Sequence, residues 1–274
     1  MRHTLTHAAS LLLLLSLPFA SCKQEAGQQP SQQETSQQQS AFTRPVKVSL
    51  GTPKDSAIVN IAFPDYPDAA LNLAITEHFS EQLGATYEGD YADCDSFARH
   101  YANRYMADMK EMHSGGFEDP DFDPVYSREV TITKGYETDR FVTFDIQTYE
   151  YDGGVHGGGA AYGMTFRKSD GRYIDENVLN TGNDPLEWNE ILKKGLMEYF
   201  EVSTEEDLES CLMDVDLYCI PMPSCGISFT EQGLSIIYQQ YEIAAYAMGR
   251  PNFVIPYEKL KPFLNVTGRR LLAE

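Results

Sequence analysis

The chain has 274 residues and carries 41 acidic against 21 basic side chains, which gives a formal net charge of −20 at pH 7. Such an excess of negative charge argues against nucleic acid or an anionic membrane surface as a partner, and favours a cationic partner or simple solubility. With 14 Phe and 17 Tyr, the sequence after residue 45 can build a core, as one large domain or two small interlocked ones.

The first 21 residues have the pattern of a secretory signal peptide. A basic start at Arg2 precedes the apolar run 11–15, and Ala20-Ser21-Cys22 has the small-small-Cys form of a bacterial lipoprotein processing site. Cleavage would leave Cys22 as a lipidated N-terminus; the alternative is an ordinary signal peptide with an incidental cysteine. We expect membrane attachment through this lipid only, because no later stretch is apolar enough to span a bilayer. The expected location is the cell envelope, at an outer membrane facing the periplasm or the cell surface.

Residues 22–44 are rich in Gln and Ser and contain no aromatic side chain before Phe42. A segment of this composition cannot bury enough apolar surface to offset its chain entropy. It is predicted to be a disordered tether between the lipid and the folded part.

The next part of the chain predicts a strand followed by two helices. The strand covers 56–63 and stops at Pro64, and the first helix begins at Pro67-Asp68 and ends at Gly84. A second helix is expected over 92–113. Its aromatic stripe, four residues apart, is more typical of a core-facing side than of a ligand groove. The apolar positions are Leu71, Ala74, Ile75, Phe79 and Leu83 in the first helix, and Phe97, Tyr101, Tyr105 and Met109 in the second.

An acidic loop, 119–124, follows the second helix and resembles part of a calcium loop, but it lacks the central Gly and the distal Glu of an EF-hand. Segments 125–134 and 140–151 then predict a hairpin, and 160–168 predicts a further strand that turns into 173–174. Between these strands lies a loop that holds His156 among five glycines. Its composition implies positive φ angles, a bulge or the close approach of another backbone. The glycines are Gly153, Gly154, Gly157, Gly158 and Gly159.

The C-terminal third mixes helices and strands. Asp184-Pro185 is typical of a helix start, and the pattern predicts helices over 186–200 and 204–213. The mixed order is typical of an α+β fold, with antiparallel sheets and inserted packed helices. The remaining predicted elements are a hairpin of 227–230 with 234–238, a strand at 253–256 and a short helix over 257–264.

If Cys22 carries lipid, four cysteines remain. An even number in an exported domain suggests disulfides, for which three pairings are possible. The spacing of the last three lacks the Cys-x-x-Cys signature of a zinc site, so no metal is predicted. The four are Cys94, Cys211, Cys219 and Cys225.

Two motifs in combination resemble the domain-of-unknown-function family 3298. The first is Gly-Gly-x-His-Gly at 153–157, and the second is the run Gln-Tyr-Glu-Ile-Ala-x-Tyr-Ala-x-Gly at 240–249, before Ile-Pro-Tyr at 255–257. Residues 137–274 resemble this domain, and 45–136 resemble the region that commonly precedes it.

The resemblance implies a binding domain of the cell envelope. Members include the extracellular sensor of lysozyme-responsive anti-sigma factors and the non-catalytic part of some peptidoglycan deacetylases. The chain departs from both, since it shows no transmembrane helix with a sigma-binding segment and no paired-His metal motif. The expected ligand is therefore lysozyme or another cationic protein, or a peptidoglycan fragment.

We expect the ligand-binding residues to be His156, Gly154, Gly157, Tyr241, Glu242 and Tyr246. Glu242 has two interpretations, as a buried acceptor that fixes its loop or as one wall of a recognition groove. The sequence has no nucleophile elbow, phosphate loop or dinucleotide motif, so no catalytic residue and no cofactor are predicted. Two alternatives stay open: an envelope glycan hydrolase using His156 with Asp152 or Glu150, and a purely structural lipoprotein.

Overall fold

The computed structural model of the protein describes residues 42–115 and 125–273. The predicted signal peptide, Cys22, residues 22–41 of the predicted tether and the acidic loop at 119–124 lie outside these ranges. Within them, no helix is both long and apolar enough to cross a membrane.

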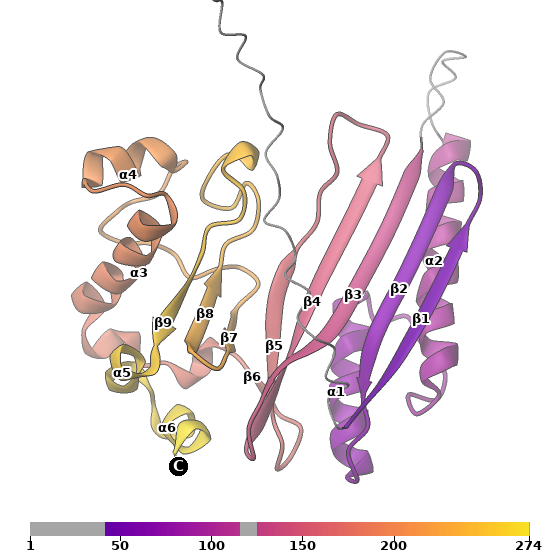
Figure 1. Ribbon diagram of the computed structural model, residues 1–274, viewed down its shortest axis with the longest axis horizontal. Helices are drawn as coiled ribbons and strands as arrows, with labels where there is room; N and C mark the ends of the chain where they lie inside the picture. The colour runs from indigo at the N-terminus through magenta and orange to yellow at the C-terminus, as the bar shows by residue number, and fades with distance from the viewer. Residues whose placement is uncertain (1–41, 116–124, 274) are drawn as a thin grey trace, which may run out of the picture. The chain divides into compact units, whose positions relative to one another are not determined.

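The first layer of the fold is a six-stranded sheet whose strands lie side by side in chain order (Figure 1). Neighbouring strands are antiparallel except β2 and β3, which run parallel. A parallel pair needs a long crossover, and helices α1 and α2 provide it. The strands are β1 (Thr43–Gly51), β2 (Asp55–Pro64), β3 (Tyr126–Glu137), β4 (Phe141–Asp152), β5 (Ala161–Arg167) and β6 (Tyr173–Ile174).

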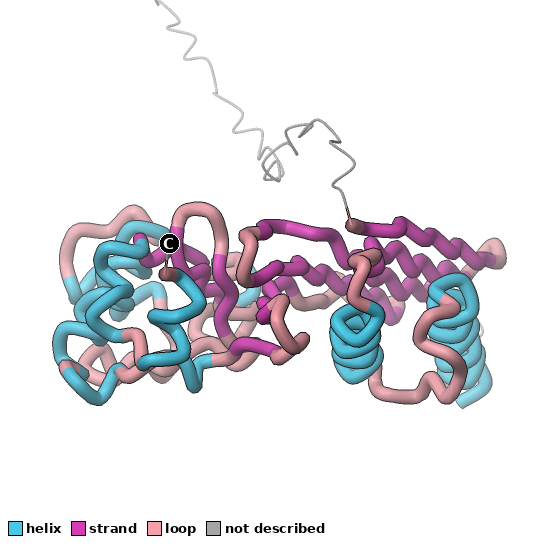
Figure 2. The backbone as a smooth tube through the Cα atoms, turned by 90° about the horizontal axis from the view of Figure 1, so that it is seen from below, coloured by secondary structure: helices cyan, strands magenta, loops and turns pink. Residues whose placement is uncertain are grey.

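Helices α1 (Ala69–Gln82) and α2 (Cys94–Gly115) cover one face of this sheet (Figure 2). Asp68 caps α1 by accepting the N–H of Ala70 at 2.9 Å, which satisfies a donor that the first helical turn leaves free. Most of the predicted apolar positions of both helices pack against alternate residues of the strands. In the stripe of α2, Phe97 and Tyr101 are buried in this core, Tyr105 is partly buried against it, and Met109 lies in a small separate cluster. Fully buried members of this core include Val59, Ile61, Phe63, Ile75, Phe79, Phe97, Tyr101 and Phe144.

The C-terminal part has a second, antiparallel sheet and its own core. The sheet order is β7 (Ile227–Phe229), β8 (Gly233–Ile237) and β9 (Asn252–Pro256). Its helices are α3 (Pro185–Tyr199), α4 (Glu205–Cys211), α5 (Tyr257–Leu260) and α6 (Val266–Leu272), with short 3-10 turns between them. Trp188, Leu192, Phe229, Tyr238 and Phe263 are among its buried side chains.

Buried hydroxyls join the two sheets. Phe229 of β7 donates its N–H to Thr165 Oγ1 at 3.0 Å and accepts a hydrogen bond from the hydroxyl of Thr143 at 2.7 Å. The two hydroxyls lie 2.8 Å apart, so Thr165 can donate to Thr143, and both hydroxyls and both backbone groups of Phe229 then have a partner. This contact holds the C-terminal part against the far face of β4 and β5.

The predicted α+β class is confirmed, and most predicted strands and helices lie within a few residues of their expected bounds. Two elements were not predicted, β1 and α6. Thr43 and Arg44, assigned by sequence to the tether, are the first two residues of β1. The expected division at residue 136 falls inside β3, so the six-stranded sheet continues across it.

The prediction of disulfides is wrong for the described part of the chain. All four cysteines there are free thiols, and Cys94 belongs to the first core whereas the others lie in or beside α4 and the loop before β7. Within the described residues, no group of three or more His, Cys, Asp or Glu side chains is arranged to hold a metal ion.

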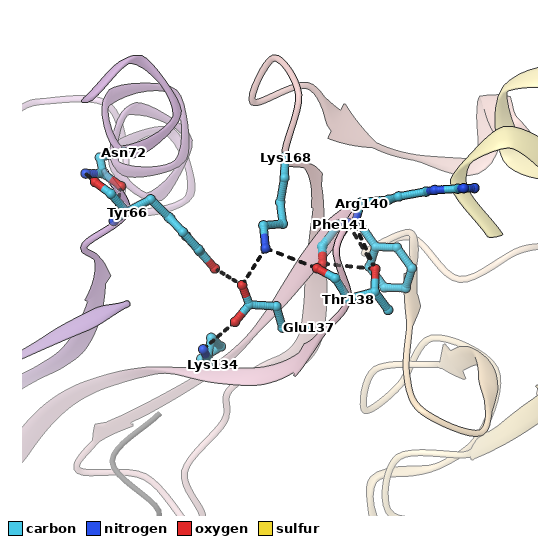
Figure 3. Close-up of polar contacts among 8 residues, drawn as sticks. All are labelled: Tyr66, Asn72, Lys134, Glu137, Thr138, Arg140, Phe141 and Lys168. Atoms are coloured by element: carbon cyan, nitrogen blue, oxygen red, sulfur yellow. Dashed lines mark hydrogen bonds and ion pairs between the residues drawn. The ribbon is translucent and has the colours of Figure 1, made fainter. Parts of the chain in front are cut away.

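An ion cluster connects the segment just before α1 to the tip of the β3–β4 hairpin (Figure 3). Glu137 accepts hydrogen bonds from Lys134 Nζ at 2.5 Å, Lys168 Nζ at 2.8 Å and Tyr66 Oη at 3.0 Å. Lys168 also donates to the carbonyl of Thr138 at 3.1 Å and lies over the Tyr66 ring. Segments far apart in sequence are thus joined through one carboxylate.

Candidate functional site

The glycine-rich loop connects β4 to β5 and carries His156 near its tip. Glu150 and Gly158 exchange both backbone hydrogen bonds, each at 2.8 Å, so the hairpin ladder continues almost to the histidine. Gly153 has a φ of +70°, a conformation that L side chains rarely adopt. A Cβ on Gly159 would lie 2.1 Å from the carbonyl oxygen of Thr148. Both a positive φ and a close backbone approach, expected from the sequence, therefore occur in this loop.

Replacing Gly159 by Ala should disturb this loop, because the added methyl group meets backbone and not a flexible side chain. We expect a loss of about 1–3 kcal/mol in the free energy of unfolding, the usual range for overpacking. Gly154→Ala is the matched control, since nothing lies within 4 Å of a Cβ there. Chemical denaturation of both variants is the measurement. Equal stability of the two variants would contradict the backbone contact at Gly159.

The second predicted segment, 239–249, is tied directly to the start of β5. The side-chain amide of Gln239 accepts the N–H of Ala161 at 3.0 Å and donates to the carbonyl of the same residue at 3.1 Å. The carboxylate of Glu242 accepts the N–H of Gln239 at 2.6 Å and that of Ser224 at 2.5 Å. Of its two predicted interpretations, Glu242 therefore has the geometry of the acceptor that fixes its loop.

This anchoring places the tyrosines of the segment against the His156 loop. The hydroxyl of Tyr246 donates to the carbonyl of Gly157 at 2.8 Å, and its ring stacks on the imidazole with 3.9 Å between centroids and 21° between planes. Tyr241 lies next to Tyr246, with 5.6 Å between ring centroids. The Tyr241 side chain is 57% exposed, although its backbone is held at a φ of +66°. A non-glycine residue in that conformation is strained, and such strain clusters at functional sites.

Together the two segments line a cavity of 280 Å³. Of the six predicted ligand-binding residues, Glu242 alone does not line it. Gln240 lines it but was not predicted, and Gln239 was not recognised as the residue that joins the two segments. The complete lining is Glu150, Asp152, Gly154, His156, Gly157, Gly158, Gly159, Gln240, Tyr241 and Tyr246. We call this the His156–Tyr241 cavity.

The cavity combines aromatic faces with negative charge. Arg128 forms an ion pair with Asp152 and lies 3.9 Å from a carboxylate oxygen of Glu150, so one cation faces two acids and a net negative charge remains. Both acids are exposed enough to meet a ligand, at 44% and 60% of the side chain respectively. Tyrosine faces beside carboxylates form an environment that suits a cationic group.

The histidine is not arranged as a general base. Its Nδ1 lies 3.1 Å from the carbonyl oxygen of Gly157, and no carboxylate of the described residues forms a hydrogen bond or ion pair with the ring. A catalytic histidine is normally oriented by a third group, most often a carboxylate. The stack on Tyr246 instead makes the ring part of an aromatic wall.

Comparison with known proteins supports the family resemblance. Residues 223–258 match the family described as "Protein of unknown function (DUF3298)", a span that includes Tyr241, Glu242 and Tyr246. No curated protein was found to match the sequence.

Two solved structures of proteins from this family share the fold. One, a member of the DUF3298 family (BF2082) from Bacteroides fragilis NCTC 9343, is 21% identical with a TM-score of 0.64, over 84% of this chain and 94% of the other. The second, a DUF3298 family protein (PA4972) from Pseudomonas aeruginosa PAO1, is 15% identical with a TM-score of 0.54, over 82% of this chain and 94% of the other. The predicted resemblance to this family of unknown function is thereby confirmed.

Proposed function

We propose that the protein is a lipid-anchored binding protein of the cell envelope, and that its His156–Tyr241 cavity recognises a cationic protein such as a lysozyme. The observation that carries the proposal is the convergence of the two motif segments on one cavity with tyrosine faces and two carboxylates. The lipoprotein pattern at Cys22 and the net charge of −20 support the location and the sign of the partner's charge. A peptidoglycan fragment is the other ligand expected from the family resemblance.

In this proposal a Lys or Arg side chain of the partner lies over the exposed ring of Tyr241 and reaches the carboxylates of Glu150 and Asp152. A cation over a tyrosine ring contributes about 0.5–2 kcal/mol, depending on how far it is desolvated. Tyr246, beside Tyr241, is held in place by its stack on His156 and by the hydrogen bond from its hydroxyl to the carbonyl of Gly157. The ring of Tyr241 lies next to that of Tyr246 but stays exposed, so a partner can reach it.

The test is retention of lysozymes and of solubilised peptidoglycan by the chain from residue 22, with Cys22→Ser to prevent lipidation, during a salt titration. Specific binding should survive moderate salt, since contacts inside the cavity are less screened than surface charge. Tyr241→Ala should weaken it about tenfold, which corresponds to about 1.4 kcal/mol. Tyr218→Ala is the control, because Tyr218 is 78% exposed and lies outside the cavity.

Retention that disappears with salt, or that Tyr241→Ala and Tyr218→Ala reduce equally, would reject recognition at this cavity. If the protein retains peptidoglycan but not lysozyme, and Tyr241→Ala abolishes that retention, the cavity is the binding site and its ligand is peptidoglycan.

A further inference from the structure

A second cavity lies along the free edge of the C-terminal sheet. Strand β9 is the outer strand of the order β7-β8-β9, and α3 runs beside it (Figure 1). The space between them measures 810 Å³ and is bordered by every residue of β9 and by one face of α3. It shares no residue with the His156–Tyr241 cavity. We call it the β9 groove.

The hydrogen-bond pattern shows which groups of β9 face the groove. Tyr238 donates its N–H to Pro251 at 2.8 Å, and the register pairs Ile236 with Phe253. Bonded and non-bonded pairs alternate along an antiparallel ladder, so Phe253 bonds toward β8 and the next residue, Val254, points its N–H and C=O outward.

Asn252 faces the groove for the same reason. The register leaves the backbone N–H and C=O of Asn252 and Val254 unbonded to β8, and no other hydrogen bond between described residues uses them. The edge thus offers two donors and two acceptors at the spacing of a strand. Natural sheets normally cover or blunt such an edge, because it is a template for pairing with another chain. Pro251 and Pro256 flank the free edge of β9 and limit its length, but the backbone groups between them stay available.

The helix shapes and charges the opposite wall. A Cβ on Gly195 would lie 2.3 Å from the ring of Phe253, so glycine lets α3 pack tightly on the face of the strand. The neighbouring turns of α3 carry Glu187, Glu190 and Glu198 toward the groove, against Lys194, and α5 adds Glu258 and Lys259 to the lining. Glu190 is already paired with Lys193 at 2.7 Å, so Glu187 and Glu198 are the acids of α3 that a partner can meet, and the lining keeps a small net negative charge. The wall therefore favours a positively charged occupant.

We propose that the β9 groove binds an extended basic peptide segment of a partner protein by adding it to the sheet beside β9. Main-chain hydrogen bonds to Asn252 and Val254 would hold the segment, as in other cases of strand addition to a free sheet edge. Basic side chains on alternate positions would then meet the glutamates of α3, because successive side chains of a strand point to opposite faces. A second copy of this chain is disfavoured as the occupant, since its own edge carries the same acidic wall.

The experiment measures binding of short dye-labelled peptides of alternating Lys and Val to the chain from residue 22 with Cys22→Ser. One peptide is N-methylated at every second residue, so that one of its two edges keeps its backbone N–H donors. Another is N-methylated at every residue, so that neither edge keeps them. Strand addition predicts that the first binds and that the second binds at least tenfold more weakly. Equal binding of the two, or no binding of either, would overturn the proposal, because attraction by charge alone does not distinguish them.

Variants of the protein locate the binding. The double change Glu187→Lys with Glu198→Lys should weaken the one-edged peptide at least fivefold, whereas Glu206→Lys with Glu209→Lys on α4, outside the groove, should not. Loss of binding in both double variants would place the peptide elsewhere. A concentration-dependent dimer that Val254→Pro abolishes, without peptide binding, would assign the edge to a second copy and reject the basic peptide. Tyr241→Ala should leave peptide binding unchanged, so failure of one proposal is distinguishable from failure of the other.

Discussion

Replacing Glu137 by Gln should lower the free energy of unfolding by about 2–4 kcal/mol, because one carboxylate holds three donors from separate segments. Its partners are Lys134, Lys168 and Tyr66 (Figure 3). The Glu137 side chain is only 19% exposed and that of Lys134 only 9%, so solvent screens the contacts weakly. Glutamine preserves the size of the side chain and leaves two ammonium groups without their shared counter-charge.

The effect should depend on pH. Burial alone would raise the pKa of Glu137, but the hydrogen bonds from Lys134, Lys168 and Tyr66 outweigh it and hold this pKa below its usual value. A carboxyl whose pKa is lower in the folded state contributes stability above its unfolded pKa of about 4.3, and loses it as the pH falls through the folded value. The difference between wild type and Glu137→Gln should therefore be full at pH 7 and shrink below about pH 4.

Urea denaturation at pH 7 and at pH 3 measures both predictions. Glu231→Gln is the control, since Glu231 is exposed in the turn between β7 and β8. A Glu137→Gln variant no less stable than this control at pH 7 would show that the cluster is not a stabilising contact.

The elements that the sequence predicted well are those with strong local signals. Asp68 and Asp184 are side-chain caps of α1 and α3, and both helices begin next to them as expected. The apolar spacing of α1 and α2 identified the side that packs on the sheet. Local chemistry decides such elements, because a cap or an apolar face acts within a few residues of the chain.

The missed elements depend on partners distant in sequence. Strand β1 alternates buried Val46 and Val48 with exposed residues, but it directly follows a Gln- and Ser-rich segment that suggested a tether. Strand β1 is specified by its antiparallel pairing with β2, which the local sequence pattern does not reveal. The parallel pairing of β2 with β3 likewise follows from the crossover through α1 and α2, which periodicity does not reveal.

Much of the candidate site was predictable because its two segments carry recognisable motifs. What the sequence could not show is the contact between them, which rests on the Gln239 amide and on the Tyr246 hydroxyl reaching Gly157. The β9 groove was not predictable either. Its open edge depends on the order of the strands in the sheet, and its acidic wall on the side of α3 that packs against Phe253.

Asp145 should show the opposite behaviour to Glu137: its replacement by Asn should stabilise the protein at neutral pH by about 1–3 kcal/mol. The residue lies in the middle of β4, on the face that meets the C-terminal part. Its carboxylate lies close against Gly135, whose Cβ would be 2.1 Å from Oδ2, and near Gly163. No hydrogen bond or ion pair from the described residues reaches the carboxylate, and burial raises the pKa of Asp145 to about 6.

The sign follows from the proton balance. Between about pH 4 and pH 6 the folded state binds this proton more tightly than the unfolded state, so stability falls as the pH rises and the full penalty remains above pH 6. Asparagine has nearly the same shape and no charge, and it removes that penalty. Stability of Asp145→Asn and wild type should therefore converge near pH 4 and separate toward pH 7.

Denaturation at both pH values tests this, with Asp139→Asn in the exposed hairpin turn as the control. If Asp145→Asn were less stable than wild type at pH 7, the charged carboxylate would have to be satisfied by a partner that it lacks among the described residues. A natural residue that destabilises the fold at neutral pH persists only where the loss is tolerated or the acid is used. Comparing the binding of both variants with wild type separates these two explanations.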